Sequence, residues 1–211
     1  HTRCREVSWA RNVYKRQRIF DVVEKDCGQY DTITEVMWVT GAALFIRLAD
    51  YREVGGLDGH FFAHMEEIDL CWRLRSRGKK LVCIPQSVVY HVGGATLKKE
   101  NPRKTFLNFR NNLLMLYKNL PDKELEHVLF IRGILDRVAA LVFYLKKDRA
   151  NARAVMQARR EFEDIRYSFA ASRIENMMKS TDEIIPERTH FSIVMKYYLL
   201  GKKHFSQLKL F

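Results

Sequence analysis

A change in the pattern of apolar residues near Asn119 is the feature that most constrains the fold of this chain. Before it, short apolar segments rich in β-branched residues, such as 36–46 and 81–84, alternate with short amphipathic segments. After it, helical stretches are expected over residues 122–147, 149–178 and 189–209. Alternation of strands and helices is typical of α/β proteins. The sequence therefore predicts an α/β region over residues 18–119 and an all-helical extension over residues 120–211.

Glycine residues mark the limits of the smaller elements. Residues 36–46 predict a buried strand, then a tight turn around Gly41, and then a second apolar segment. Residues 48–54 predict a short helix, because Gly55-Gly56 follows and glycine commonly ends a helix. Residues 105–119 predict a longer helix.

The segment 66–77 predicts an amphipathic helix, because apolar residues recur along it and Gly78 follows. Its first turn holds three acids, Glu66, Glu67 and Asp69, in a chain of formal net charge +12. Carboxylates in a first turn gain about 0.3–1 kcal/mol each from the helix dipole, which explains them without any catalytic role. Alternatively, one of them accepts a proton from a substrate.

Composition favours a packed, intracellular chain. Its 211 residues are 47% hydrophobic, enough to bury one good core. The four cysteines show no CxxC pairing, which indicates reduced thiols rather than a zinc or disulfide site. The longest apolar run, 138–145, is far shorter than the ~20 residues of a spanning helix, and no signal peptide is visible. We expect a cytoplasmic location.

The positive charge lies mostly in the second half of the chain and favours anionic partners. Residues 128–145 combine aliphatic side chains with Arg132 and Arg137, which would suit a helix at the inner face of the cytoplasmic membrane, although core packing is the alternative. A basic nucleic-acid-binding module is a rival interpretation. Because no nucleic-acid motif is present and the acids of 66–69 would repel phosphate, we expect no nucleic acid.

Several short motifs follow one another in order between residues 36 and 112. They are Trp38-Val39-Thr40-Gly41-Ala42, Arg47, Val54-Gly55-Gly56-Leu57-Asp58, Phe61-Phe62, Glu66-Glu67-Ile68-Asp69-Leu70, Arg73, Gly78, Pro85, His91 and Arg110-Asn111. Their order and spacing resemble the C-terminal, acceptor-side half of a family 2 bacterial glycosyltransferase, inverting and rhamnosyltransferase-like. The resemblance implies a partial GT-A fold over residues 18–119, a nucleotide-sugar donor and a saccharide or lipid-linked glycan acceptor. It also implies hexosyl or rhamnosyl transfer in cell-envelope polysaccharide biosynthesis.

The resemblance places the general base at Glu67, where the family more often has Asp. Either carboxylate can take the proton of an acceptor hydroxyl, but the additional methylene changes its reach. One base suffices for this reaction, because a nucleotide diphosphate leaves without being protonated. A glycosidase, in contrast, needs two carboxyl groups across the bond.

The other acids and the nearby motifs have lesser expected roles. Glu66 is expected to meet an acceptor hydroxyl, and Asp69 to bond to backbone or an arginine and orient the helix. Trp72 is expected in the core or, alternatively, as a stacking surface for a sugar. By resemblance, the turn Thr40-Gly41-Ala42 lies beside the sugar, although an ordinary tight turn would explain it as well.

The donor side of the reaction requires groups for the metal and the diphosphate. By resemblance, His91 is a ligand of a divalent metal, Mg or Mn. Thr96 and Arg110 are candidates to contact the diphosphate, whose developing charge the metal would offset.

The Asp-x-Asp motif with which family 2 enzymes hold this metal does not occur in the chain. We therefore expect a piece of a longer enzyme, without the donor-binding half and inactive alone. Residues 1–17 are either native or a leader that is not natural protein. A non-catalytic scaffold descended from the transferase is the remaining alternative.

Overall fold

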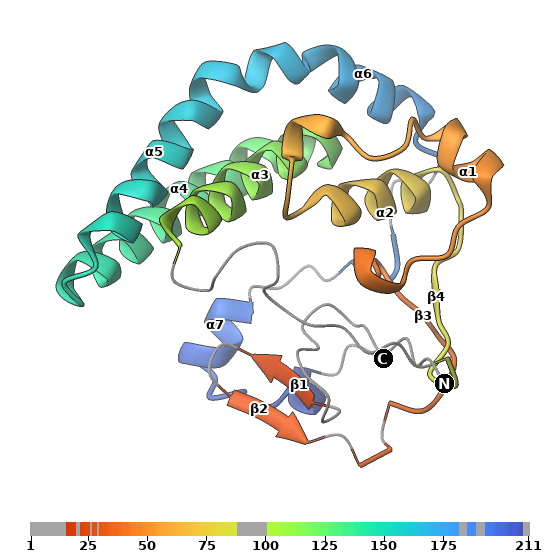
Figure 1. The fold of residues 1–211 in the computed structure, drawn as a ribbon, viewed down its shortest axis with the longest axis horizontal. Coiled ribbons are helices and arrows are strands. Elements are labelled where there is room, and N and C mark those ends of the chain that lie inside the picture. Colours follow the sequence, from red (N-terminus) through yellow and green to blue (C-terminus); the bar gives the residue numbers. More distant parts are fainter. Residues whose placement is uncertain are drawn as a thin grey trace. The chain divides into compact units, whose positions relative to one another are not determined.

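The computed structural model describes most of the chain, in two compact units (Figure 1). The described residues are 16–19, 22–25, 27–28, 30–87, 101–181, 185–188 and 193–208. One unit comprises His1–Arg47, Lys79–Gly93 and Ile184–Phe211, and the other comprises Leu48–Gly78 and Gly94–Glu183. The second unit contains the acids of interest.

Among its described residues, the first unit has two small antiparallel sheets. Strand β1 (Arg16–Ile19) pairs with β2 (Val22–Lys25), and β3 (Thr34–Glu35) pairs with β4 (Val82–Cys83). The register of the second pair places Thr34 opposite Cys83. The unit also contains the 3₁₀ helices η1 (Gly41–Ala43) and η4 (Phe205–Leu208) and the helix α7 (Ile193–Tyr198).

Two sequence predictions in this unit were wrong. The strand expected after Val36 does not form, because β3 ends at Glu35. The expected tight turn is present as η1, where the Thr40 hydroxyl accepts a hydrogen bond from the Ala42 N–H at 3.4 Å. The apolar run is nevertheless partly buried, at Val36 and Val39. The continuous helix expected over 189–209 does not form across the described residues 193–208, which contain α7 and η4 and, between them, Gly201 with a φ of 63°.

The second unit is almost entirely helical over its described residues, 48–78 and 101–181. Its helices are α1 (Leu48–Glu53), α2 (Glu66–Ser76), α3 (Pro102–Asn119), α4 (Asp122–Leu145), α5 (Arg149–Ile165) and α6 (Ala170–Lys179), with the 3₁₀ helices η2 (Gly59–Phe61) and η3 (Arg166–Phe169). Helix α3 packs against α5, α6 and α2, and α4 packs against α5 (Figure 1). The helix expected over 149–178 is divided into α5 and α6 by η3. The predicted boundary at Asn119 falls inside this unit.

Local sequence explains where these helices begin and end. Asn101 caps α3 by accepting a hydrogen bond from the Arg103 N–H at 2.9 Å, and Pro102 occupies the first helical position. Pro121 prevents α3 from continuing. Lys147, with a φ of 62°, reverses the chain between α4 and α5, and Asp148 then caps α5 through the Asn151 N–H at 3.1 Å.

The apolar core of the second unit joins α2 to α3 and α5. Its fully buried members are Phe61, Leu70, Leu74, Leu113, Leu114, Val155 and Phe162. Burial of each such side chain contributes about 1.5–3 kcal/mol, so α2 is held firmly against the helices after residue 100. The prediction of a fold that mixes helices with strands is confirmed, with helices dominating.

Candidate active site

The Gly-Gly segment after α1 is a tight turn that requires glycine. Gly55 and Gly56 have φ values of 83° and 67°, and a Cβ on Gly56 would approach the Tyr51 ring to 2.9 Å. The Tyr51 hydroxyl accepts a hydrogen bond from the Leu57 N–H at 3.1 Å. Asp58 then caps η2 by accepting from the His60 N–H at 3.0 Å. This turn brings the chain from α1 back to the beginning of α2.

A buried polar network fixes that turn to α2 and α3. The fully buried Asp69 carboxylate accepts hydrogen bonds from Arg73 Nε at 3.0 Å, Lys118 Nζ at 3.0 Å and Asn119 Nδ2 at 2.8 Å. Arg73 also donates to the carbonyl oxygens of Val54 and, at 2.7 Å, Gly56. Asp69 therefore orients backbone and cations inside the protein, out of reach of a substrate.

Lys118 extends the network to Asp58. Its ammonium lies 2.7 Å from Asp58 Oδ2. Burial alone would raise the pKa of Asp58, but hydrogen bonds and charge from Lys118, with hydrogen bonds from His60, outweigh it and lower that pKa to about 2. Asp58 is thus ionised at every physiological pH.

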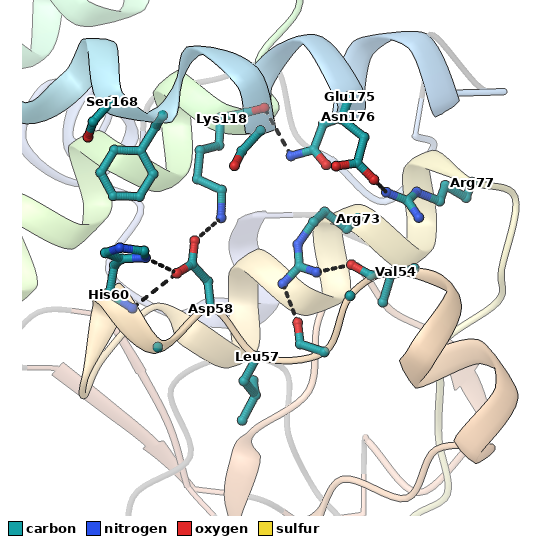
Figure 2. A pocket seen from close by; sticks show the side chains of 15 residues that line it. Val54, Leu57, Asp58, His60, Arg73, Arg77, Lys118, Ser168, Glu175 and Asn176 are labelled. Carbon is teal, nitrogen blue, oxygen red and sulfur yellow. Dashed lines mark hydrogen bonds and ion pairs between the residues drawn. The ribbon is translucent and has the colours of Figure 1, made fainter.

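A cavity of about 710 Å³ lies between this turn, α2 and α6 (Figure 2). Its polar lining includes Arg73, Arg77, Lys118, Asp58, Glu175 and Asn176, with Phe169 contributing an aromatic ring. Figure 2 shows Lys118 directed at Asp58 and Arg73 directed at the turn. Cationic and anionic side chains are both present, so the lining suits a neutral polar ligand better than an anion. Glu67 does not line this cavity.

The loop between η2 and α2 has an unusual backbone. Phe62 has φ 60° and ψ −56°, and the Ala63 N–H donates to the Phe61 carbonyl at 2.6 Å, which is the rare positive-φ form of the γ-turn. His64 and Met65 have φ values of 71° and 74°. Positive φ at a residue other than glycine costs about 1–3 kcal/mol. The chain therefore enters α2 through a strained segment.

Asn111 on α3 holds this loop. Its fully buried side-chain amide donates to the carbonyl oxygens of Phe61 at 2.8 Å, Ala63 at 2.9 Å and His64 at 2.8 Å. The neighbouring Arg110 donates to the His60 carbonyl at 3.0 Å and pairs with Glu161 at 2.7 Å. Arg110 is thus engaged within the protein.

Glu66 and Glu67 begin α2 directly after the strained loop and are half-buried. Burial, followed by the negative charge of Glu66 and a hydrogen bond between the two carboxyl groups, raises the pKa of Glu67 to about 7. The Oε2 atom of each carboxyl is buried and has no hydrogen-bond partner within the described part of the chain. A carboxyl group that titrates near neutrality can accept a proton and release it again at physiological pH.

The other candidate site residues lie in the core, at the η1 turn or outside the described residues. Trp72 is buried in the core of the second unit, with 7% of its surface exposed. In the first unit, Thr40 caps η1, and Gly41 and Ala42 are exposed. His91 and Thr96 lie outside the described residues.

Within the described ranges, no three His, Cys, Asp or Glu side chains converge to hold a metal ion. The same residues include no helix with the length and apolarity needed to cross a bilayer.

The curated proteins to which this chain is similar include several glycosyltransferases. No family model and no solved structure matches the chain. A pre-mycofactocin glycosyltransferase of Mycobacterium tuberculosis is 31% identical over 141 residues, which are 62% of this chain and 29% of that protein. The N-acetylglucosaminyl-diphospho-decaprenol L-rhamnosyltransferase of the same species is 31% identical over 39% of this chain and 25% of its own length. Rhamnosyltransferase WbbL of Escherichia coli is 32% identical over 33% of this chain and 25% of its own length.

The chain spans less than a third of the length of each of these relatives. The resemblance that the motifs indicate is confirmed by these matches: the chain is similar to glycosyltransferases, rhamnosyltransferases among them.

Proposed function

We propose that this chain supplies the acceptor side of an inverting glycosyltransferase in which Glu67 is the general base. The observation that carries the proposal is the half-buried Glu67 carboxyl at the start of α2, whose pKa is raised to about 7 and whose Oε2 has no hydrogen-bond partner among the described residues. Asp69 in the same turn is also buried, but Arg73, Lys118 and Asn119 satisfy its carboxylate, whereas the Glu67 Oε2 is left without such partners among the described residues. The similarity to glycosyltransferases gives the reaction class.

The proposed reaction is a single displacement. The hydroxyl oxygen of the acceptor forms a bond to the anomeric carbon of the donor sugar while its proton passes to the Glu67 carboxylate. The bond from the anomeric carbon to the diphosphate oxygen breaks, and its electron pair leaves with the nucleotide diphosphate. Attack from the side opposite the leaving group inverts the anomeric configuration. Glu67, now protonated, loses its proton to water before the next cycle.

Glu66 assists this role through its charge. Its carboxylate favours the protonated form of Glu67 and so strengthens Glu67 as a base. Its own buried Oε2 has no hydrogen-bond partner among the described residues, so it retains the capacity to accept a hydrogen bond from an acceptor hydroxyl. We assign base function to Glu67 and acceptor contact to Glu66.

Binding of the nucleotide-sugar donor is the function that a complete GT-A fold would supply. The chain covers at most 29% of the length of the relatives described above and has no Asp-x-Asp motif. We therefore assign nucleotide-sugar binding to another segment and expect no sugar transfer by residues 1–211 alone. A divalent metal with His91 as ligand remains a prediction.

We also propose that α4 rests on an anionic membrane. Its exposed apolar residues recur along one face at Phe130, Ile134, Val138, Leu141 and Leu145. Three exposed cations, Arg137 in the C-terminal half of α4 and Lys146 and Lys147 directly after it, would meet anionic head groups. One relative is named for a decaprenol-linked acceptor, which is a lipid. The membrane contact would bring such an acceptor within reach.

The experiment is a transfer assay on the complete product of the gene that carries this chain. An activated rhamnose donor is supplied with N-acetylglucosaminyl-diphospho-decaprenol, the acceptor in the name of one relative. Formation of a glycan with inverted anomeric configuration supports the proposal. Binding of the glycan acceptor without transfer from any nucleotide sugar would indicate a non-catalytic scaffold instead.

A further inference from the structure

We propose that Asn111 is a positioning residue for Glu67, because its side-chain amide holds the strained loop from Phe61 to Met65 that delivers the acidic pair. The inference rests on the proposed role of Glu67 as base. It assigns to an asparagine on α3 the placement of a carboxyl group on α2, 44 positions earlier in the sequence.

Three backbone carbonyls converge on the side-chain amide of Asn111. The oxygens of Phe61, Ala63 and His64 all lie 2.8–2.9 Å from Asn111 Nδ2. An amide nitrogen has two N–H groups, so one of them serves two oxygens. Asn111 is fully buried, and water therefore has no access to replace it. Without this amide, three inward-facing carbonyls would lose a partner.

The Asn111 amide maintains an unusual backbone conformation in the loop from Phe61 to Met65. Phe62, His64 and Met65 all have positive φ, although none of them is glycine. Each would relax toward negative φ if the contacts that hold it were lost. Such relaxation rotates the intervening peptide planes and turns the three carbonyls away from Asn111.

The loop from Phe61 to Met65 leads directly into the acidic first turn of α2. Met65 occupies the N-cap position of α2 and makes no side-chain capping bond. The start of the helix is therefore oriented by the backbone of residues 61–65 rather than by a cap. Glu66 and Glu67 follow at once, so any change in that backbone redirects their carboxyl groups and opens the first turn to water.

Asn111 is itself oriented by its neighbour. Arg110 Nε donates to Asn111 Oδ1 at 3.0 Å, which leaves the nitrogen end of the amide to face the loop. Arg110 is anchored in turn by Glu161 on α5. Replacement by aspartate would put a second carboxylate oxygen against three carbonyl oxygens, and an ionised carboxylate has no hydrogen to donate.

The simpler interpretation is that Asn111 only stabilises the fold. Both interpretations predict a less stable variant, but only a positioning role predicts a change at Glu67. When the loop relaxes, the desolvation that raises the pKa of Glu67 decreases, and that pKa falls toward its ordinary value of 4.5. The measurement must therefore be made on the Glu67 carboxyl itself.

The experiment follows the carboxyl carbons of ¹³C-labelled glutamate in the 211-residue chain by NMR during a pH titration, with Glu67→Gln assigning the signal. We expect Glu67 to titrate near pH 7 in the wild type, and at least about one unit lower in Asn111→Ala and Asn111→Asp. Asn151→Ala is the matched control, because Asn151 is also a buried asparagine on a helix but bonds to Thr105 and Asp148. The control should leave Glu67 near pH 7. An unchanged Glu67 in folded Asn111 variants would overturn the inference.

A second variant keeps the test decisive if Asn111→Ala does not fold. Phe62 is 65% exposed, so Phe62→Gly relieves the γ-turn with little loss of packing. The double variant should recover the helical circular dichroism that Asn111→Ala loses. Failure of the double variant to recover it would contradict the proposal that Asn111 offsets backbone strain.

Transfer kinetics separate the two proposals. In the complete gene product, Asn111→Ala should lower kcat by about tenfold or more with little change in donor KM, because a misplaced base slows the chemical step. If Glu67→Gln leaves transfer intact, the proposed function fails whatever Asn111 does. If Glu67→Gln abolishes transfer while Asn111→Ala changes neither the Glu67 titration nor kcat, the positioning role alone fails.

Discussion

Replacement of Glu67 by Gln should stabilise the chain at pH 8. The pKa of this group is raised from 4.5 to about 7, so the folded chain binds a proton that the unfolded chain has already released. Stability from this group is therefore greatest below about pH 4.5 and declines as the pH rises toward 7. Above pH 7 the ionised carboxylate is a destabilising element of the fold, and Gln removes its charge while keeping its shape.

The size of the effect follows from the shift. One pKa unit corresponds to about 1.36 kcal/mol, so a shift from 4.5 to about 7 corresponds to at most about 3.4 kcal/mol. Since the carboxyl is only half-buried, solvent screening reduces this to about 1.7 kcal/mol at pH 8. At pH 5 the folded carboxyl is still protonated. With the same reduction for solvent screening, the expected stabilisation by Gln is about 0.4 kcal/mol.

Urea unfolding followed by helical circular dichroism at the two pH values measures this difference. Glu175→Gln is the control, because hydrogen bonding and charge from Lys179 lower the pKa of Glu175 rather than raise it. The control should not gain stability between pH 5 and pH 8. If Glu67→Gln is less stable than the wild type at pH 8, or if its effect does not depend on pH, Glu67 is not the desolvated carboxyl described above.

Three further predictions concern the rate, the polar network and the membrane. The transfer rate of the complete gene product should rise about tenfold between pH 6 and pH 8 and then level off, since a base with a pKa of about 7 acts only when ionised; a flat profile would exclude Glu67 as base. Asp69→Asn should destabilise the chain by about 3 kcal/mol in urea unfolding, because Arg73 loses its buried counter-charge and Lys118 loses one of its two carboxylate partners. Asp148→Asn, which keeps a capping side chain, should leave the unfolding midpoint unchanged, and equal effects of the two would contradict the buried network. The chain should float with vesicles containing anionic lipid at low salt, and Leu141→Glu with Leu145→Glu should prevent it; flotation that survives both changes would place the contact elsewhere.

Sequence patterns are sufficient for the helices that carry the site. The helix expected over 66–77 is α2, because its limits are set by local signals: acids in the first turn and Gly78 after the last. The same holds for α3, whose predicted start at 105 lies three residues inside the observed one, and whose end is set by Pro121. The strand wrongly expected before the Gly41 turn shows the weakness of a short apolar run, since burial alone does not distinguish a strand from an irregular buried segment.

The organisation of the site depends on contacts that no local pattern contains. Asn111 meets carbonyls that lie 47–50 residues earlier, and Lys118 meets Asp58 from 60 residues away. In sequence, Lys118 and Asn119 look like ordinary polar residues at the end of a helix. The strained loop is equally hidden, because the residues with positive φ are Phe62, His64 and Met65, and no glycine marks them. Among the sequence motifs, the Arg110-Asn111 pair indicated that this position on α3 matters. It did not indicate that the Asn111 amide would hold the loop before α2.

The most direct test of the central claim compares Glu67→Gln with Glu66→Gln in the complete gene product, with acceptor binding measured beside sugar transfer. A general base contributes about 10²–10⁴ to a rate. We predict that Glu67→Gln lowers kcat by at least about a hundredfold with acceptor affinity within a few-fold of the wild type, whereas Glu66→Gln mainly weakens acceptor binding. Transfer by Glu67→Gln at a rate close to that of the wild type would contradict the account.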